Sequence, residues 1–497
     1  MPKSLSPRLE DLRQEIEGFA RGFGLDFFET VFEVLSYDEL NMVAAYGGFP
    51  NRYPHWRWGM EYEQLSKGYE YGISKIYELV INNDPCYAYL LESNAEVDQK
   101  LVMAHVYGHC DFFKNNFYFQ HTNRRMMDEM ANHATRVRRW VDKIGVEKVE
   151  DFIDRALSLE NLIDFHSPYI RRAPDPKRAE AESKSNDRVE GFKVDREYMR
   201  GYMNPPEFLE LQRRKVEDVK QRAKKFPERP QRDVLLFLLE HAPLEQWEFD
   251  ILSTLREEAY YFAPQGQTKI MNEGWASFWH STIMTQKALK DHEVLDYADR
   301  HSGTMGTRPG ALNPYKLGIE LWRDIEERWN KGRFGKEYDE CDDLRARRSW
   351  DKKLGLGREK IFEVRKHYND VTFIDSFLTA EFAIEQKLFV YGFNDKRNSW
   401  EILDREFRKV KDKLLSQLTN FGQPVIEVVD GNYENRGELL LGHKHDAQDL
   451  KPDEARETLR SLQTLWRRPV NIVTKMEGKG VMLRYDGQTQ SDKKVDL

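Results

Sequence analysis

The sequence predicts a mainly α-helical protein, in which a large helical domain precedes a small C-terminal α+β domain. Apolar residues recur at spacings of three and four in the first part of the chain, as in residues 9–23, and this is the pattern of amphipathic helices. Strand-like segments separated by turn residues appear only near the end. With 497 residues, of which 40% are hydrophobic and 12% aromatic, the chain can build a packed core.

The first 170 residues are mostly helical in this prediction. They contain an aromatic loop, Asn51 to Gly59, in which Pro54 and Gly59 interrupt regular structure and the aromatic rings require cover. A break at Asp84-Pro85 precedes the longest of the early helices. The predicted helices cover about residues 9–23, 38–46, 60–80 and 95–116.

Residues 171–232 are crowded with charges and prolines, which is typical of a linker or a solvated insertion. Helical patterning then returns, with predicted helices at 245–262, 269–290 and 315–329. We therefore place the large helical domain at residues 1–385.

Residues 386–490 form the predicted α+β domain. Asp430-Gly431-Asn432 is a hairpin signal between two apolar segments. The polar residues 491–497 form a tail. The segments of this domain are strands at 425–429, 438–441, 470–473 and 480–485 and a helix at 452–466.

Several classes of protein are excluded or disfavoured by composition. The longest apolar run, Val234 to Leu239, is far shorter than the about 20 residues of a membrane-spanning helix. The N-terminus lacks a signal-peptide core, and three scattered cysteines do not form a disulfide framework, so we expect a cytoplasmic protein. A net charge of −8 gives no general reason to bind nucleic acid. The chain contains neither a phosphate-binding glycine loop nor a G-x-S-x-G nucleophile motif.

The strongest chemical signal is the pair His105 and His109. Histidines four residues apart on a helix share one face, so both imidazoles can reach one metal ion, as in H-E-x-x-H zinc proteins. Here Val106 replaces the glutamate that normally serves as the general base. The simpler alternative is two buried histidines that are hydrogen-bonded to carbonyl or carboxylate groups.

The second signal lies in Met271 to His280, where Glu273 and His280 share one face of a helix rich in Trp and Phe. Buried charges need partners, so these two residues either hold helices together or belong to a site. Together with the histidine pair, Glu273 completes a His₂Glu set suited to a divalent zinc or iron ion. His280 is a fourth ligand or a proton donor in this hypothesis. Glu61 or Glu258 would replace the missing base.

The chain resembles the SpoVR family, whose founding type is stage V sporulation protein R. The resemblance covers about residues 8–490 and rests on several blocks in the same order. These blocks are residues 51–56, 80–86, 109–116, 242–247, 271–280 and 312–318.

This resemblance implies a role in forming the spore cortex or, in relatives that do not sporulate, in stationary-phase and stress responses. It implies as partners a PrkA-type serine kinase and a von Willebrand A-like protein. The family supplies no reaction, so three hypotheses stay open. One is a metal-dependent hydrolase, and another is a non-catalytic regulator or scaffold that works with the kinase. The third is a protein that binds a peptidoglycan precursor without turnover.

Overall fold

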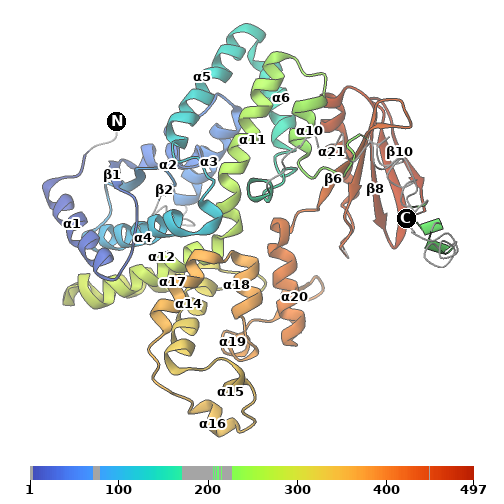
Figure 1. Ribbon diagram of the computed structural model, residues 1–497. Helices are drawn as coiled ribbons and strands as arrows, with labels where there is room; N and C mark the ends of the chain where they lie inside the picture. Colours follow the sequence, from blue (N-terminus) through green and yellow to red (C-terminus); the bar gives the residue numbers. More distant parts are fainter. Residues whose placement is uncertain are drawn as a thin grey trace, which may run out of the picture. The chain divides into compact units, whose positions relative to one another are not determined.

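The computed structural model describes residues 4–70, 79–170, 226–446 and 448–496, with a few isolated positions between 205 and 214. It confirms the mainly helical class with a sheet-containing C-terminal region (Figure 1). The chain divides into two compact units. The first comprises Met1–Val146 and Tyr260–Gly422, and the second comprises Glu147–Ala259 and Gln423–Leu497. The predicted linker, 171–232, falls mostly outside the described residues, and the predicted domain boundary at residue 385 stays a prediction.

The first unit is built mainly from helices, together with a small sheet that the sequence analysis did not predict. In that sheet β1 (Thr30–Leu35) runs parallel to β3 (Cys86–Leu91), and β2 (Leu79–Ile81) runs antiparallel to β3. A separate hairpin pairs β4 (Val390–Asn394) with β5 (Ser399–Asp404). The α-helices are α1 (Pro7–Gly22), α2 (Tyr37–Ala45), α3 (Trp56–Glu70), α4 (Glu96–Asn115), α5 (Met126–Ile144), α12 (Lys269–Ile283), α13 (Val294–Thr304), α14 (Pro314–Lys331), α15 (Lys336–Asp339), α16 (Leu344–Arg348), α17 (Gly357–His367), α18 (Asp370–Phe377), α19 (Ala380–Glu385) and α20 (Phe407–Leu418).

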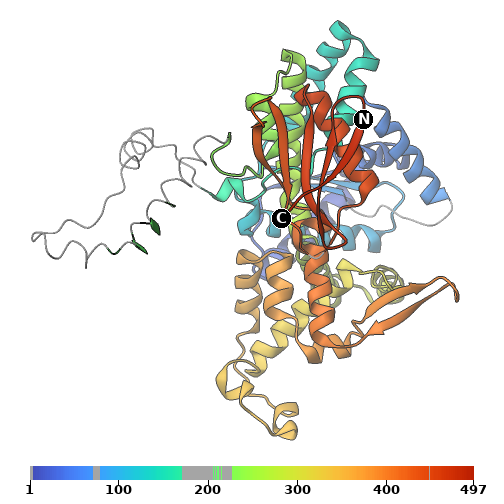
Figure 2. The same ribbon diagram turned by 90° about the vertical axis from the view of Figure 1, so that its right-hand side faces the viewer.

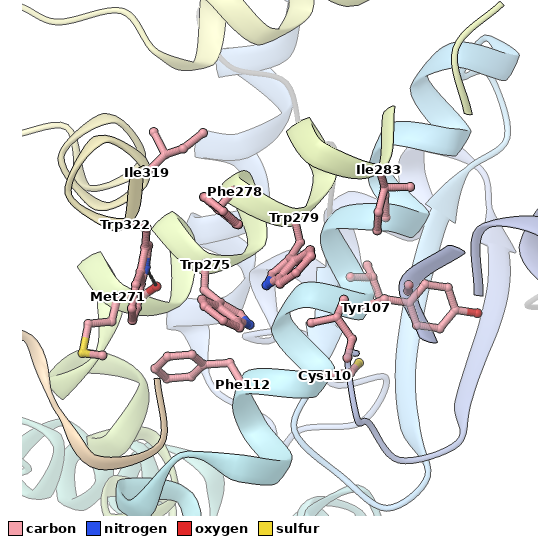
Figure 3. Close-up of a cluster of buried hydrophobic side chains, with 14 of the residues drawn as sticks. Tyr107, Cys110, Phe112, Met271, Trp275, Phe278, Trp279, Ile283, Ile319 and Trp322 are labelled. Carbon is pink, nitrogen blue, oxygen red and sulfur yellow. Dashed lines mark hydrogen bonds between the residues drawn. The ribbon is translucent and has the colours of Figure 1, made fainter. Parts of the chain in front are cut away.

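Helix α12 lies at the centre of this unit, because it is apolar on nearly every side. Trp275 and Trp279 are completely buried, and a helix that is hydrophobic all round must be enclosed by others. Figure 3 shows both indole rings between α12 and α4, with Trp275 near Phe112. On the other side of α12, the indole N–H of Trp322 donates to the carbonyl of Met271 at 3.1 Å.

Glycines let α12 approach its two neighbours closely. A Cβ added to Gly108 of α4 would lie 2.7 Å from the Cα of Ala276, and one added to Gly274 would lie 2.4 Å from the backbone of Gly318 in α14. A larger side chain at any of these glycines would force the helices apart. Gly108 and Gly274 are the neighbours of His109 and Glu273, so these two close helix contacts lie beside the predicted site.

The second unit contains α6 (Val146–Leu157), α10 (Val234–His241), most of α11 (Gln246–Gln267) and a five-stranded sheet. Helix α21 (Pro452–Trp466) packs on the sheet (Figure 2). Its residues Leu459, Leu462 and Leu465 are buried. The strand order is β10-β9-β8-β7-β6, in which only β7 and β8 are parallel. The strands are β6 (Ile426–Tyr433), β7 (Glu438–His443), β8 (Val470–Met476), β9 (Lys479–Tyr485) and β10 (Gln490–Lys494).

Two local predictions were misplaced. The hairpin turn was predicted at Asp430 to Asn432, but β6 runs on to Tyr433, and the turn is made by Glu434 and Asn435, which both have positive φ. Helix α11 was expected to end at residue 262, but it continues to Gln267 with Pro264 inside it.

Candidate metal centre

Helix α4 presents His105 and His109 on one face, one turn apart. The helix is enclosed from Val97 to Phe113, so both imidazoles are buried, with exposed fractions of 2% and 4%. The ring centroids lie 4.6 Å apart. A buried imidazole pair of this kind has its polar atoms directed at a small number of fixed partners rather than at water.

Glu273 comes from α12 and faces both histidines. Its Oε2 lies 3.7 Å from Nε2 of His105 and 3.4 Å from Nε2 of His109. The ligand atoms of these three residues all lie within 4.8 Å of one another, in an arrangement that could hold a metal ion. The structure thus brings together residues that are separated by 164 positions in the chain.

The spacing of these atoms fits metal coordination. Bonds of about 2.0–2.2 Å at tetrahedral or octahedral angles place neighbouring ligand atoms about 2.9–3.6 Å apart. The distance of 3.4 Å falls in that range, and 3.7 Å lies just above it. Small rotations of the side chains would therefore bring all three ligand atoms to coordination distance without moving either helix.

Asn272 determines which nitrogen of His109 faces the centre. The two groups are joined by a hydrogen bond of 2.9 Å between Nδ1 of His109 and Oδ1 of Asn272. An amide oxygen only accepts, so Nδ1 of His109 carries a proton, and in the neutral ring Nε2 presents a lone pair toward Glu273. A lone pair that faces a carboxylate oxygen requires a cation between them, either a proton or a metal ion.

A metal ion meets this requirement better than a proton does, because three groups converge. A proton bridges two atoms, whereas His105 also directs Nε2 at the same carboxylate oxygen. That oxygen, Oε2 of Glu273, is buried and has no hydrogen-bond partner among the described residues.

His280 lies behind His105, on the side away from Glu273. Its Nδ1 is 2.9 Å from Nδ1 of His105, and its Nε2 is 3.2 Å from Nδ1 of His301. Burial, followed by the nearby rings of His105 and His301, lowers the pKa of His280 far below its usual value, so the ring is neutral. Glu273 and His280 share one face of α12 as the sequence predicts, and His105 lies between them.

Two of the predicted site residues are not part of this group. Glu61 of α3 forms an ion pair with Arg57 at 2.7 Å. Glu258 is buried on α11 and belongs to the second unit. A role for either residue as a general base stays a prediction.

The residues around the ligands were not found from the sequence. Asn272 immediately precedes Glu273 in the motif that we singled out, but helical spacing alone directs it to another side of the helix. His301 lies on α13 in a segment without a recognisable motif. Only their ability to accept a hydrogen bond could have pointed to Asn272 and His301, because a histidine ligand normally donates its second N–H to a fixed acceptor.

The comparisons with known proteins identify relatives along most of the chain. Residues 4–423 match the family model described as SpoVR like protein, and residues 424–477 match the SpoVR-like C-terminal domain. The chain is 28% identical over 476 residues to Uncharacterized protein YcgB of Escherichia coli (strain K12), covering 91% of this chain and 89% of the relative. No solved structure matches. In the described part of the chain no helix has the length and apolar character needed to cross a membrane.

Proposed function

We propose that this chain, which belongs to the SpoVR family, is a metal-dependent protein with its centre at His105, His109 and Glu273. The family resemblance supplies no reaction, so the proposal rests on the geometry of the site. The observation that carries this proposal is the pair of converging lone pairs, on His109 Nε2 and Glu273 Oε2, 3.4 Å apart in a buried site. His105 supplies the third ligand atom.

The donor set fits zinc or ferrous iron. Two imidazoles and one carboxylate are the ligands of hydrolytic zinc sites, and also of the iron sites that activate oxygen. In the hydrolytic case, which we favour, a bound divalent ion would lower the pKa of its water to about 7. The chain's own residues would orient the two histidine ligands, because Asn272 holds the ring of His109 and His280 holds the ring of His105.

The metal content of the purified protein tests this proposal. We expect about one zinc or iron ion per chain by elemental mass spectrometry when no chelator is used. The ion should be absent from a His105→Ala/His109→Ala variant whose circular dichroism is unchanged. A His443→Ala/His445→Ala variant is the matched control, because it removes two histidines from the second unit. Wild-type protein that holds no metal, even after reconstitution, would reject the proposal.

The biological setting follows from the family resemblance. We propose a cytoplasmic role in spore cortex formation or in the stress response of stationary phase. The second candidate function is a regulator or scaffold that works with a PrkA-type kinase and a von Willebrand A-like protein. The separately recognised C-terminal domain, residues 424–477, supports this candidate as a partner-binding module. Pull-down of the kinase by wild-type protein and equally by the metal-free variant would favour the scaffold.

A further inference from the structure

Three imidazoles form a continuous hydrogen-bonded line that starts at the candidate metal centre. His105 of α4 contacts His280 of α12 at 2.9 Å, and His280 contacts His301 of α13 at 3.2 Å. His105 and His280 are buried, whereas His301 is only partly buried. The line therefore connects the centre to a residue close to the surface of the first unit.

Only one arrangement of protons along this line allows His105 to bind a metal ion. Ligation through Nε2 requires the proton of His105 to be on Nδ1, which then donates to Nδ1 of His280. His280 must carry its own proton on Nε2, and that N–H donates to Nδ1 of His301. If every bond ran in the opposite direction, His105 would carry its proton on Nε2, and that N–H would point into the centre and block ligation.

His301 is therefore the last acceptor of the line, and its ring is held in place for this role. The ring of Tyr297 stacks on it with centroids 5.6 Å apart and an angle of 18° between planes. Burial, and then the charge of Arg323, lower the pKa of His301, which keeps the ring neutral and Nδ1 able to accept.

We propose that His301 is a positioning residue for the metal centre, acting through His280 to hold His105 in the tautomer that directs its Nε2 lone pair at the metal ion. This inference rests on the proposed function. It gives the two histidine ligands different supports. His109 is held by its direct hydrogen bond to Asn272, whereas His105 depends on a second ring and on a third helix.

The test is titration of the metal-depleted full chain with Co²⁺, followed by the visible absorption of the bound ion and by competition with a chelating indicator. Outer partners of histidine ligands typically contribute 10–100-fold to metal affinity. We expect His301→Phe, which keeps a ring but removes the acceptor, to weaken Co²⁺ binding about 10-fold. His301→Asn should bind like the wild type, because its Oδ1 occupies about the place of Nδ1. His292→Phe is a control on a neighbouring exposed histidine.

A double-mutant comparison separates this role from general destabilisation. Because His301 acts only through His280, His301→Phe should have no further effect in a His280→Phe background. Equal Co²⁺ affinity of His301→Phe and wild type would overturn the inference, as would an undiminished effect of His301→Phe in the His280→Phe background. If the wild type itself binds no Co²⁺, the proposed function fails and this inference fails with it, so the two failures are distinguishable.

Discussion

Asp370 caps the helix that carries Glu273, although it lies about a hundred residues further along the chain. Its carboxylate accepts hydrogen bonds from the backbone N–H of Ile270 at 2.8 Å and of Met271 at 2.9 Å. Thr268, the N-cap residue by position, makes no capping bond with its side chain. A tertiary contact thus does what a local cap normally does.

Asp370 predicts a pH dependence of stability. Burial raises its pKa from 3.8 to about 7, although the two backbone hydrogen bonds act to lower it. Between these values the folded protein holds a proton that the unfolded chain has lost, so stability falls as the pH rises through this window and levels off above it. From pH 5 to 8 the metal-depleted wild type should lose about 2–3 kcal/mol more than Asp370→Asn.

Urea unfolding of both proteins in the presence of a chelator measures this difference. Other groups that titrate in the same range contribute equally to both proteins, among them Asp111, whose pKa burial raises to about 6. They cancel when the two curves are subtracted. Parallel curves for the wild type and Asp370→Asn would show that Asp370 stays ionised in the folded state.

Lys100 predicts a large loss of stability by a different mechanism. Its ammonium group is buried and donates to both carboxylate oxygens of Glu293, at 3.0 and 2.9 Å, and to the carbonyl of Ala288. Lys100→Met leaves the Glu293 charge buried and unpaired, which should cost about 3–5 kcal/mol in urea unfolding. Lys100→Met/Glu293→Gln should recover part of this loss. A double variant as unstable as the single one would reject the unpaired charge as the cause.

The individual ligand candidates could be found from the sequence, but their surroundings could not. His105 and His109 are recognisable because helical spacing is local, and it places both rings on one face. The approach of Glu273 depends on how α4 and α12 cross, which no spacing in the chain encodes. The contacts of Asn272 and His301 depend in addition on the rotation of single imidazole rings. The sequence therefore predicts the ligand candidates but not the residues that hydrogen-bond to them.

The candidate centre depends on helices that cross each other closely. Gly108 lets α4 meet α12, and Gly274 and Gly318 let α12 meet α14. Gly108→Ala should destabilise the protein by about 1–3 kcal/mol, because the added methyl group would lie 2.7 Å from the Cα of Ala276. It should also weaken metal binding, because the helices that supply the histidines and Glu273 would move apart.

Gly18→Ala is the matched control for this prediction. Gly18 also lies inside a helix, α1, but no heavy atom lies within 4 Å of an added Cβ. Alanine is the better helix former by about 1 kcal/mol, so Gly18→Ala should be neutral or stabilising in thermal unfolding. If Gly108→Ala behaved in the same way, close contact between α4 and α12 would not be what holds this region together.

The helices of the fold were easier to predict than the strands of the first unit. The segments predicted at 95–116 and 315–329 correspond to α4 and α14 within two residues at each end, because their apolar spacing is helical along their whole length. The strand β3 reads Cys-Tyr-Ala-Tyr-Leu-Leu and is buried at nearly every position, so it lacks the alternation that reveals a half-exposed strand. Its parallel pairing with β1 joins segments more than fifty residues apart, and sequence patterns do not report such pairing.

The division of the chain into two units predicts which part of the molecule a bound metal ion stabilises. All three candidate ligands lie in the first unit, and the sheet β6–β10 lies in the second. A ligand that binds only the folded state stabilises it by about 2.7 kcal/mol at a hundred times its dissociation constant.

Hydrogen exchange followed by mass spectrometry, with and without chelator, should therefore show slower exchange in peptides from α4 and α12 when metal is present. Peptides from β7 and β8 should exchange equally in both conditions, because a compact unit without the ligands gains nothing directly from binding. Equal protection of both sets of peptides would mean that the two units unfold together, and an unchanged α4 would argue against a metal ion at His105 and His109.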